Sequence, residues 1–262
     1  MQASIIIPVH NNFILTKKCI ESIRKSTDNN NYEIIVINNG STDETEEFLK
    51  KIEVIFINNK ENLGVAKAWN QGIKSARGEF LFIINNDIII CKNFIKNMIE
   101  FYESIKNIGI ASPGTKEGQL NYDFYSYSDK FIKKMKKIKE KGFCGWCMLI
   151  KKDRFEKTGL FSEEYNIGIG EDTDFYFRLK KLGYESYITG SVFVHHFGSK
   201  TLKELKSRIG NNFEKENIKK LMQKWDIKEP VYIMRKLRNF KKFINNIYLK
   251  IFYGYTLISR EK

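Results

Sequence analysis

The chain has 262 residues, of which 42% are hydrophobic and 14% aromatic, and its formal net charge is +14. This size and apolar content predict a substantial folded core and exclude a disordered protein. No apolar stretch reaches the ~20 residues that span a bilayer, no basic segment typical of a signal peptide opens the chain, and four cysteines are too few for a disulfide scaffold, so we expect a reduced, cytoplasmic protein.

The positive charge is concentrated in two runs. The first, 130–141, has the sequence KFIKKMKKIKEK, and the second, 235–250, holds six basic residues and no acidic one. Basic surfaces favour anionic partners such as nucleotide phosphates and lipid headgroups. Solvated helix faces are the simplest explanation of both runs and contact with a membrane surface is the next; nucleic acid is not expected as a partner.

In chain order, the first ninety residues alternate between short apolar runs and helical patterns. We predict strands at 4–9, 33–38, 53–57 and 79–84, separated by helices at 15–25, 43–51 and 65–76. Continuous Ile, Val and Phe runs are typical of strands buried on both faces of a parallel sheet. The alternation predicts a doubly wound α/β layer.

Beyond residue 91 the pattern is less regular. Helices are predicted at 93–104 and 171–182, and strands at 108–112, 143–150 and 186–195. The Gly-, Tyr- and Ser-rich segment 113–130 is expected to be an irregular binding loop. Everything from Leu202 onward looks helical. We therefore expect a domain at 1–201 followed by a basic helical extension at 202–262.

Three polar clusters directly follow predicted strands. They are Pro8-Val9-His10-Asn11, the segment 38–43 with the sequence NNGSTD, and Asn85-Asn86-Asp87. Parallel strands end at one edge of the sheet, where ligands bind in α/β proteins, so the clusters are expected to converge on one site. Asp87 suits a hard divalent cation such as Mg²⁺ or Mn²⁺, which prefers oxygen ligands. The alternative is that Asp87 caps a following helix.

The segment Gly170-Glu171-Asp172-Thr173-Asp174 begins a predicted helix. A carboxylate kept ionised there could act as a general base, although three acids at a helix N-terminus are also explained by the helix dipole. Glu171 and Asp172 are neighbours, so only one can point directly into a crevice. His195, near the end of a predicted strand, could complete a metal site with Asp87, or it could be an ordinary surface histidine.

The segment Cys144-Gly145-Trp146-Cys147 has the spacing of a redox CxxC motif. Its strand-like flanks disfavour a thioredoxin-type pair, which begins a helix, and no two further ligands at suitable spacing support a structural zinc. Gly145 and Trp146 are better explained as residues that line a substrate pocket. Neither a GxGxxG fingerprint nor a P-loop is present.

Taken together, the motifs resemble the family 2 glycosyltransferases. The resemblance spans about residues 3–201 and implies a GT-A-type fold, that is, a doubly wound, Rossmann-like α/β fold with a mixed sheet, here with a helical C-terminal extension. The matching segments, in order, are SIIIPVHNN (4–12), INNGSTDETEEFL (37–49), ENLGVAKAWNQGI (61–73), INND (84–87), FCGWCMLIKKDRFEKTGLFSEEY (143–165), GEDTDFYFRLKKLGY (170–184) and VFVHHFGSKT (192–201).

The resemblance implies an inverting, metal-dependent transfer of a sugar from a nucleoside diphosphate, UDP or dTDP, to a hydroxyl of a glycan, lipid-linked or protein acceptor in bacterial surface-glycan assembly. It implies a nucleotide-binding half at 1–90 and an acceptor and catalytic half at 91–201. By similarity, Asp172 is the base with Glu171 beside it, and Asp87 and His195 hold Mn²⁺ or Mg²⁺. Gly145 and Trp146 lie on the acceptor side, and the donor contacts are Pro8, His10, Asn39, Lys67, Asn70, Asn85 and Asn86.

The chain departs from the family pattern at Asn38, Asn39 and Asn85, where many members have Asp. Asn can hydrogen-bond a base or ribose but adds no charge to a metal, so a weak, donor-assisted metal site is expected.

The C-terminal segment 235–262 mixes lysines with aromatic and aliphatic residues, including Phe240, Phe243, Ile247, Ile251 and Phe252. It could lie on the inner membrane surface as an amphipathic helix, pack on the main domain, or join a second subunit. Two other functions stay open at this point. One is a sugar nucleotidyltransferase, and the other is a non-catalytic anion- or membrane-binding protein that keeps the fold.

Overall fold

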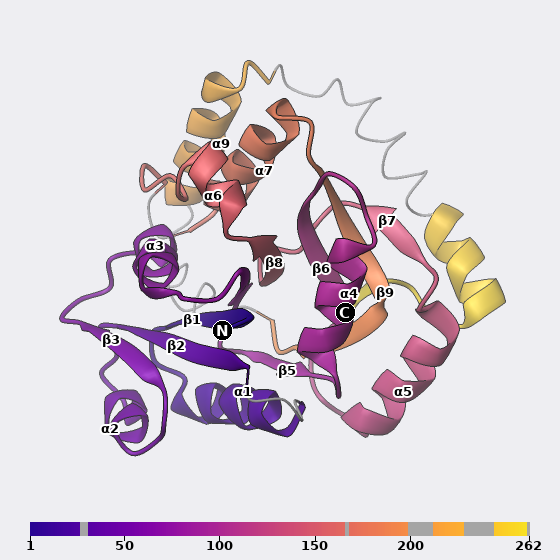
Figure 1. Ribbon diagram of the computed structural model, residues 1–262, viewed down its shortest axis with the longest axis horizontal. Coiled ribbons are helices and arrows are strands. Elements are labelled where there is room, and N and C mark those ends of the chain that lie inside the picture. Colours follow the sequence, from indigo (N-terminus) through magenta and orange to yellow (C-terminus); the bar gives the residue numbers. More distant parts are fainter. Residues whose placement is uncertain (27–30, 166–167, 199–211, 228–243, 261–262) are drawn as a thin grey trace.

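A computed structural model describes residues 1–26, 31–165, 168–198, 212–227 and 244–260. Its strands form one ten-stranded mixed sheet, whose main path has the order β3-β2-β1-β4-β8-β6-β9-β5. Strand β10 pairs with β6 and β7 pairs with β9 beside this path. Helices cover both faces of the sheet (Figure 1).

The N-terminal half alternates as predicted. Its four strands run parallel to one another, because a helix crosses over between each strand and the next. Strand β3 lies two residues later than the predicted 53–57. The elements are β1 (Ala3–Val9), α1 (Phe13–Ser26), β2 (Tyr32–Asn39), α2 (Thr45–Lys50), β3 (Ile55–Asn59), α3 (Val65–Ser75) and β4 (Phe80–Ile84).

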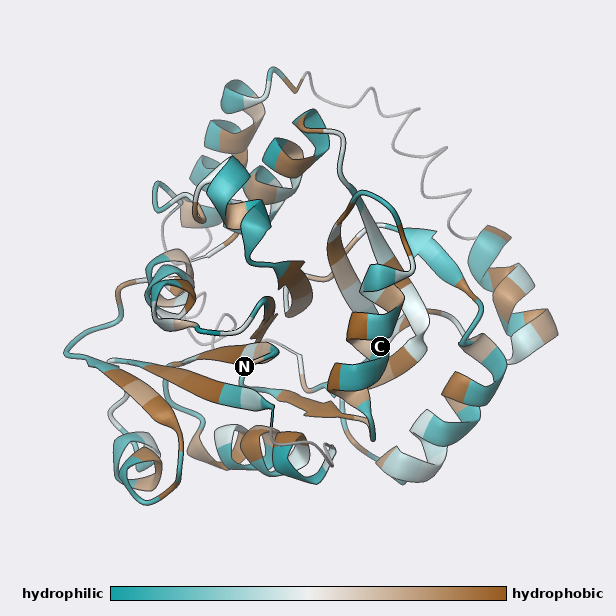
Figure 2. Ribbon diagram, in the orientation of Figure 1, coloured by the Kyte–Doolittle hydropathy of each residue, from teal (hydrophilic) through white to brown (hydrophobic). Residues whose placement is uncertain are grey.

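Each central strand is apolar on both sides because helices lie on both. In β1, Ile5 and Ile7 face the core that contains Cys19 and Ile20 of α1. Ile6 faces the opposite core, with Ile73 of α3 and residues of α6 and α7. Figure 2 shows these central strands in brown and the helices with mixed faces.

The second half turns the sheet into a mixed one. Strand β8 runs antiparallel between β4 and β6, and β5 runs antiparallel to the end of β9. The elements are β5 (Ile88–Ile90), α4 (Phe94–Glu103), β6 (Ile108–Glu117), α5 (Phe124–Met135), β7 (Lys139–Lys141), β8 (Cys147–Lys151), α6 (Asp153–Thr158), α7 (Glu171–Lys181) and β9 (Glu185–His196).

The predicted irregular loop at 113–130 is wrong. Strand β6 continues to Glu117, and α5 begins at Phe124 after Asp123, whose side chain accepts a hydrogen bond from the Ser126 N–H at 2.6 Å. The buried face of α5 consists of Phe124, Ser128, Phe131 and Met135, a helical spacing that the polar composition of the segment obscures. This segment is therefore a wall of the main core.

The C-terminal region is not entirely helical. Helix α9 (Asn212–Lys224) and a helix at 244–253 are followed by β10 (Ile258–Arg260), which extends the sheet alongside Thr115–Glu117 of β6. Strand β10 can pair there because β6 runs past the end of β8. Phe240, Phe243 and the basic residues of 235–242 lie outside the described residues. Among the residues that are described, no helix has the length and apolarity needed to cross a membrane.

Candidate active site

The three polar clusters meet, as predicted, at the carboxyl ends of β1, β2 and β4. They border a cavity of about 360 Å³ that also receives residues from the 145–146 turn and the start of α7. Its lining residues are Pro8, Val9, His10, Asn39, Asn62, Val65, Trp69, Asn85, Asn86, Asp87, Gly145, Trp146, Gly168, Ile169, Glu171 and Asp172.

The loop after β1 is held against the loop after β2. Asn11 and Asn12 both have positive φ angles, 59° and 63°, which Asn tolerates better than most residues. The Asn11 N–H donates to Ser41 Oγ at 2.9 Å, and the Thr42 N–H donates to Asn11 Oδ1 at 2.7 Å. The two asparagines thereby fix the rim beside His10.

Asn39 organises the adjacent wall. Its Nδ2 donates to Asn62 Oδ1 at 2.8 Å, and its Oδ1 accepts from the Leu63 N–H at 3.1 Å. Its carbonyl oxygen lies 2.9 Å from Nδ1 of His10. The Asn39 side chain therefore positions the 62–64 loop, which an ionised Asp could not do in the same way because it cannot donate.

Asp87 lies on the floor of the cavity between β4 and β5. It caps no helix, since α4 begins at Phe94 and the Asp87 carbonyl accepts from the Phe197 N–H at 2.9 Å. Its carboxylate Oδ1 is 3.2 Å from Nε2 of His196, whose ring stacks on Trp146 at 5.0 Å.

The histidine beside Asp87 is His196, whereas His195 was predicted to lie there. Successive residues of β9 point to opposite sides of the sheet. His195 turns away, and its Nδ1 lies 2.8 Å from the Tyr122 hydroxyl. The sequence predicted a strand here, but it did not indicate which of the two adjacent histidines points toward Asp87.

Asp87 and His196 fit a divalent cation only in part. They supply one carboxylate and one imidazole, and the described residues contain no cluster of three or more His, Cys, Asp or Glu side chains that could hold a metal. Mg²⁺ and Mn²⁺ commonly take the remaining oxygen ligands from substrate phosphates and water. The donor set therefore fits a cation that binds together with a diphosphate.

Two carboxylates enter the cavity from the first turn of α7. Burial, and then the charge of Asp172, raise the pKa of Glu171, whose Oε2 has no hydrogen-bond partner among the described residues. Burial also raises the pKa of Asp172, although its Oδ1 accepts hydrogen bonds from Thr173. The helix starts after Gly170, whose φ is 116°, and among the described residues no side-chain hydrogen bond is made from this N-cap position. Helix capping alone therefore does not account for the pair.

Gly145 makes room for the Asp172 carboxylate. A β-carbon on Gly145 would lie 2.2 Å from Oδ2 of Asp172, far inside van der Waals contact. The flanking Cys144 and Cys147 have buried thiols, and burial raises the pKa of Cys147 well above its ordinary value. The segment is thus a close contact between backbone and carboxylate, and its buried thiols are poor candidates for redox chemistry.

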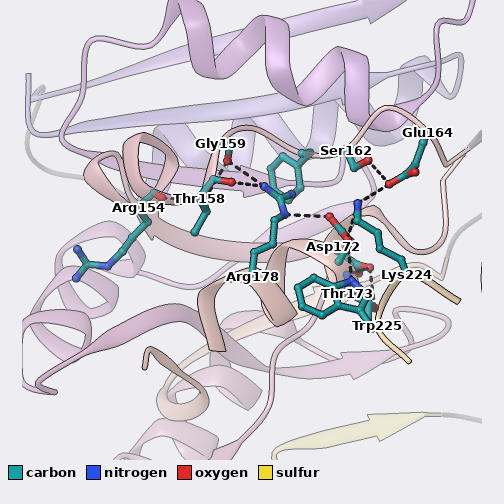
Figure 3. A network of polar contacts seen from close by, with 12 residues as sticks. Arg154, Thr158, Gly159, Ser162, Glu164, Asp172, Thr173, Arg178, Lys224 and Trp225 are labelled. Carbon is teal, nitrogen blue, oxygen red and sulfur yellow. Dashed lines mark hydrogen bonds and ion pairs between the residues drawn. The ribbon is translucent and has the colours of Figure 1, made fainter. Parts of the chain in front are cut away.

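Residues at the C-terminal end of α9 contact helix α7 through Asp174. Asp174, which has no exposed surface, accepts from Arg178 Nε at 3.0 Å, from Lys224 Nζ at 3.0 Å and from the Trp225 indole N–H at 2.9 Å. Lys224 also pairs with Glu164 at 2.5 Å. Figure 3 shows Arg178, Lys224 and Trp225 converging on this turn. We call these five residues the α7 clamp.

Lys67 and Asn70, which were predicted to contact the donor, are not among the residues that line the cavity. Lys67 is exposed on α3. Asn70 is buried and donates to the Phe161 carbonyl at 2.9 Å while its Oδ1 accepts from the Phe161 N–H at 3.0 Å. Asn86 lines the cavity but also donates to Thr16 Oγ1 at 2.9 Å. Trp69, Asn62 and Ile169 line the cavity without having been predicted.

Comparison with known proteins agrees with this architecture. The model of "Glycosyl transferase family 2" matches residues 4–159. YfnE of Bacillus subtilis, an uncharacterized glycosyltransferase, is 31% identical over 42% of this chain and 29% of its own length. GgaB of the same organism, a minor teichoic acid biosynthesis protein, is 30% identical over 47% of this chain and 15% of its own length.

The chain thus spans less than a third of each of these relatives. Among solved structures, GalNAc-T7 with UDP, GalNAc and Mn²⁺ superimposes with a TM-score of 0.62 at 18% identity, over 75% of this chain and 44% of that one. That likeness supports the fold. The chain belongs to glycosyl transferase family 2 and has the GT-A fold.

Proposed function

We propose that the chain transfers a sugar, with inversion at the anomeric carbon, from a nucleoside diphosphate to an acceptor hydroxyl. The observation that carries this proposal is that Asp87 and Asp172, on separate elements, line one cavity. A single displacement needs its base on the side opposite the leaving group, so the two carboxylates must come from different parts of the chain.

Asp172 is the proposed base. Burial raises its pKa, which makes its ionised form a better proton acceptor than an exposed carboxylate. As the acceptor oxygen bonds to the anomeric carbon, its proton passes to the Asp172 carboxylate. The bond from the anomeric carbon to the phosphate oxygen breaks, and its electron pair leaves with the diphosphate.

Asp87 and His196 are the proposed residues at the diphosphate. They would hold a divalent cation, Mn²⁺ or Mg²⁺, together with the phosphate oxygens, and such an ion supplies positive charge where the leaving group becomes negative. The GalNAc-T7 structure contains Mn²⁺ and UDP, which is consistent with this assignment. His196 stacked on Trp146 also links the proposed leaving-group side to the acceptor side.

We place the nucleoside beside Pro8, His10 and Asn39, and propose UDP or dTDP as the nucleotide. The Asn39 carbonyl and the 62–64 loop that its side chain holds form the wall that a base would meet. For the acceptor we propose a cell-surface glycan, lipid-linked or protein precursor, made at the cytoplasmic side of the membrane. A relative named for teichoic acid biosynthesis supports this class.

A donor screen tests the proposal. UDP-, dTDP- and GDP-sugars are incubated with the protein and either Mn²⁺ or EDTA, and release of the nucleoside diphosphate is measured. We expect release from a UDP- or dTDP-sugar only with the cation, and proton NMR of the first product should show the anomeric configuration opposite to the donor's. Retention of configuration, or release of pyrophosphate from a nucleoside triphosphate instead, would contradict it.

A further inference from the structure

The helix at 244–253 has two apolar faces. On one, Leu249 is only 3% exposed and Tyr253 packs against the main core. The other face is exposed along its whole length, with Ile251 and Phe252 at 71% and 68%. Figure 2 shows brown residues along this helix at the right of the view. We call this exposed face the apolar stripe, and it consists of Ile244, Ile247, Tyr248, Ile251 and Phe252.

The stripe is a single surface because its members are three or four residues apart, which aligns them on one side of a helix. One face of the helix already satisfies its contact with the domain, so packing on the main sheet does not account for the other. A large contiguous apolar patch is uncommon on a protein surface, and it marks a site of interaction with a partner or a membrane.

Lysines from the first basic run lie near the C-terminal end of the helix that carries the stripe. Lys134 Nζ is 5.8 Å from the centre of the Tyr255 ring and 3.7 Å from the point where a side chain on Gly254 would begin. Lys130 lies one turn earlier on the same side of α5, and Lys250 lies on the helix itself. All three are exposed. The folded chain thus brings lysines of the two basic runs, far apart in sequence, to the helix that carries the apolar stripe.

The helix that carries the stripe is joined to the main sheet by the residues that follow it. After the helix, Leu257 is buried, and its carbonyl accepts from the Thr115 N–H at 2.7 Å, where β10 joins the sheet. Arg260 of β10 pairs with Glu117 at 2.9 Å and lies 5.9 Å from the centre of the Trp146 ring, on the cavity wall. Strand β10 therefore connects the helix that carries the stripe to a residue of the cavity wall.

We propose that the apolar stripe and its flanking lysines, Lys130, Lys134 and Lys250, dock this chain on the surface of an anionic lipid bilayer. Apolar side chains enter the headgroup region while lysines contact anionic headgroups. A second copy of the chain is the less favourable occupant, because pairing two stripes would bring lysines of like charge together. The surface goes beyond the proposed transfer reaction and does not depend on it.

Co-sedimentation with vesicles tests the docking surface without any turnover. The full chain should bind vesicles of phosphatidylglycerol mixed with phosphatidylcholine, and binding should fall at least tenfold with phosphatidylcholine alone or at high salt. Ile251→Asp with Phe252→Asp should reduce binding at least tenfold, and Lys130→Gln with Lys134→Gln severalfold. The matched controls are Leu182→Asp and Lys180→Gln with Lys181→Gln, exposed changes at the C-terminal end of α7, which should bind like the wild type.

Four results would overturn the docking surface. They are no binding to either vesicle, equal binding to both, equal losses in the control variants, or sedimentation showing a wild-type dimer that Ile251→Asp with Phe252→Asp dissociates while vesicle binding persists. Failure of the catalytic proposal would look different. The stripe variant should still release UDP from a dissolved UDP-sugar at the wild-type rate, because the stripe does not line the cavity.

Discussion

Single residues explain why the segment at 144–147 has its sequence. Gly145 faces the Asp172 carboxylate so closely that a methyl group would meet Oδ2 at 2.2 Å. We predict that Gly145→Ala displaces Asp172 and lowers turnover by at least tenfold, while costing about 1–3 kcal/mol of stability. Turnover with saturating donor and the melting temperature check this.

Gly109→Ala is the matched control for that substitution. Its β-carbon would meet Leu179 and Tyr184 at 3.1 Å, away from the residues that line the cavity. It should lose stability with little change in turnover. Equal losses of turnover in both variants at temperatures where both are folded would show that overpacking, and not the position of Asp172, limits the reaction.

Glu171 makes stability depend on pH. Burial and the charge of Asp172 raise its pKa above the ordinary 4.5. At pH values between these two pKa values, the folded protein holds a proton on Glu171 that the unfolded chain has released. This contribution is complete below pH 4.5 and is lost as the pH rises through the raised pKa. Glu171→Gln should therefore lose less stability between about pH 5 and about pH 9 than the wild type, by about 1 kcal/mol or more. Urea unfolding at several pH values measures this difference, and parallel curves for the two proteins would contradict it.

At the scale of elements, the α7 clamp connects the C-terminal region to the turn that carries Asp172. The indole N–H of Trp225 is one of three donors to the fully buried Asp174 carboxylate. Trp225→Phe keeps an aromatic ring against Phe177 but leaves that carboxylate short of a donor. We predict a loss of about 1–3 kcal/mol of stability and a fall in kcat with little change in the donor KM.

Lys219→Ala serves as the control for the α7 clamp, since Lys219 is exposed on α9, the helix that directly precedes Trp225. Its kcat, its donor KM and its melting temperature should equal those of the wild type. A Trp225→Phe variant with normal kcat would show that α9 stabilises α7 without positioning the base.

The accuracy of the predicted elements follows from what determines each one. The strands β1, β2 and β4 were predictable because burial on both faces demands continuous apolar runs. Helix α5 was missed because its buried positions include Ser128 and its half-buried ones include the two tyrosines Tyr125 and Tyr127. Strand β10 forms because the end of β6 has an edge with which it can pair. That edge is a tertiary feature, so the local sequence of β10 does not indicate it.

Site residues follow the same logic. The convergence of Asp87 and Asp172 was predictable from strand ends and from a helix start, and both line the cavity. The choice between His195 and His196 required the phase of β9, and the burial of Asn70 required its contact with Phe161. Residues whose placement depends on one tertiary contact were those that the sequence could not assign.

For the whole molecule, the family match covers residues 4–159, whereas Asp172 lies beyond it on α7. The cavity combines Asp87, from the turn between β4 and β5, with Asp172 of α7. Trp225, directly after α9, donates a hydrogen bond to Asp174 of that same helix. The two carboxylates should consequently fail in different ways when neutralised.

Comparing Asp172→Asn with Asp87→Asn measures that difference most directly, using the sugar nucleotide that the screen identifies, with calorimetry for donor binding in Mn²⁺ and single-turnover kinetics for transfer. We predict that Asp172→Asn binds donor within about twofold of the wild type and transfers about 10²–10⁴-fold more slowly. We predict that Asp87→Asn binds donor at least tenfold more weakly, in a manner that added Mn²⁺ partly restores. Wild-type transfer by Asp172→Asn, or unchanged donor and Mn²⁺ binding by Asp87→Asn, would contradict the assignment of the two carboxylates to opposite sides of one sugar.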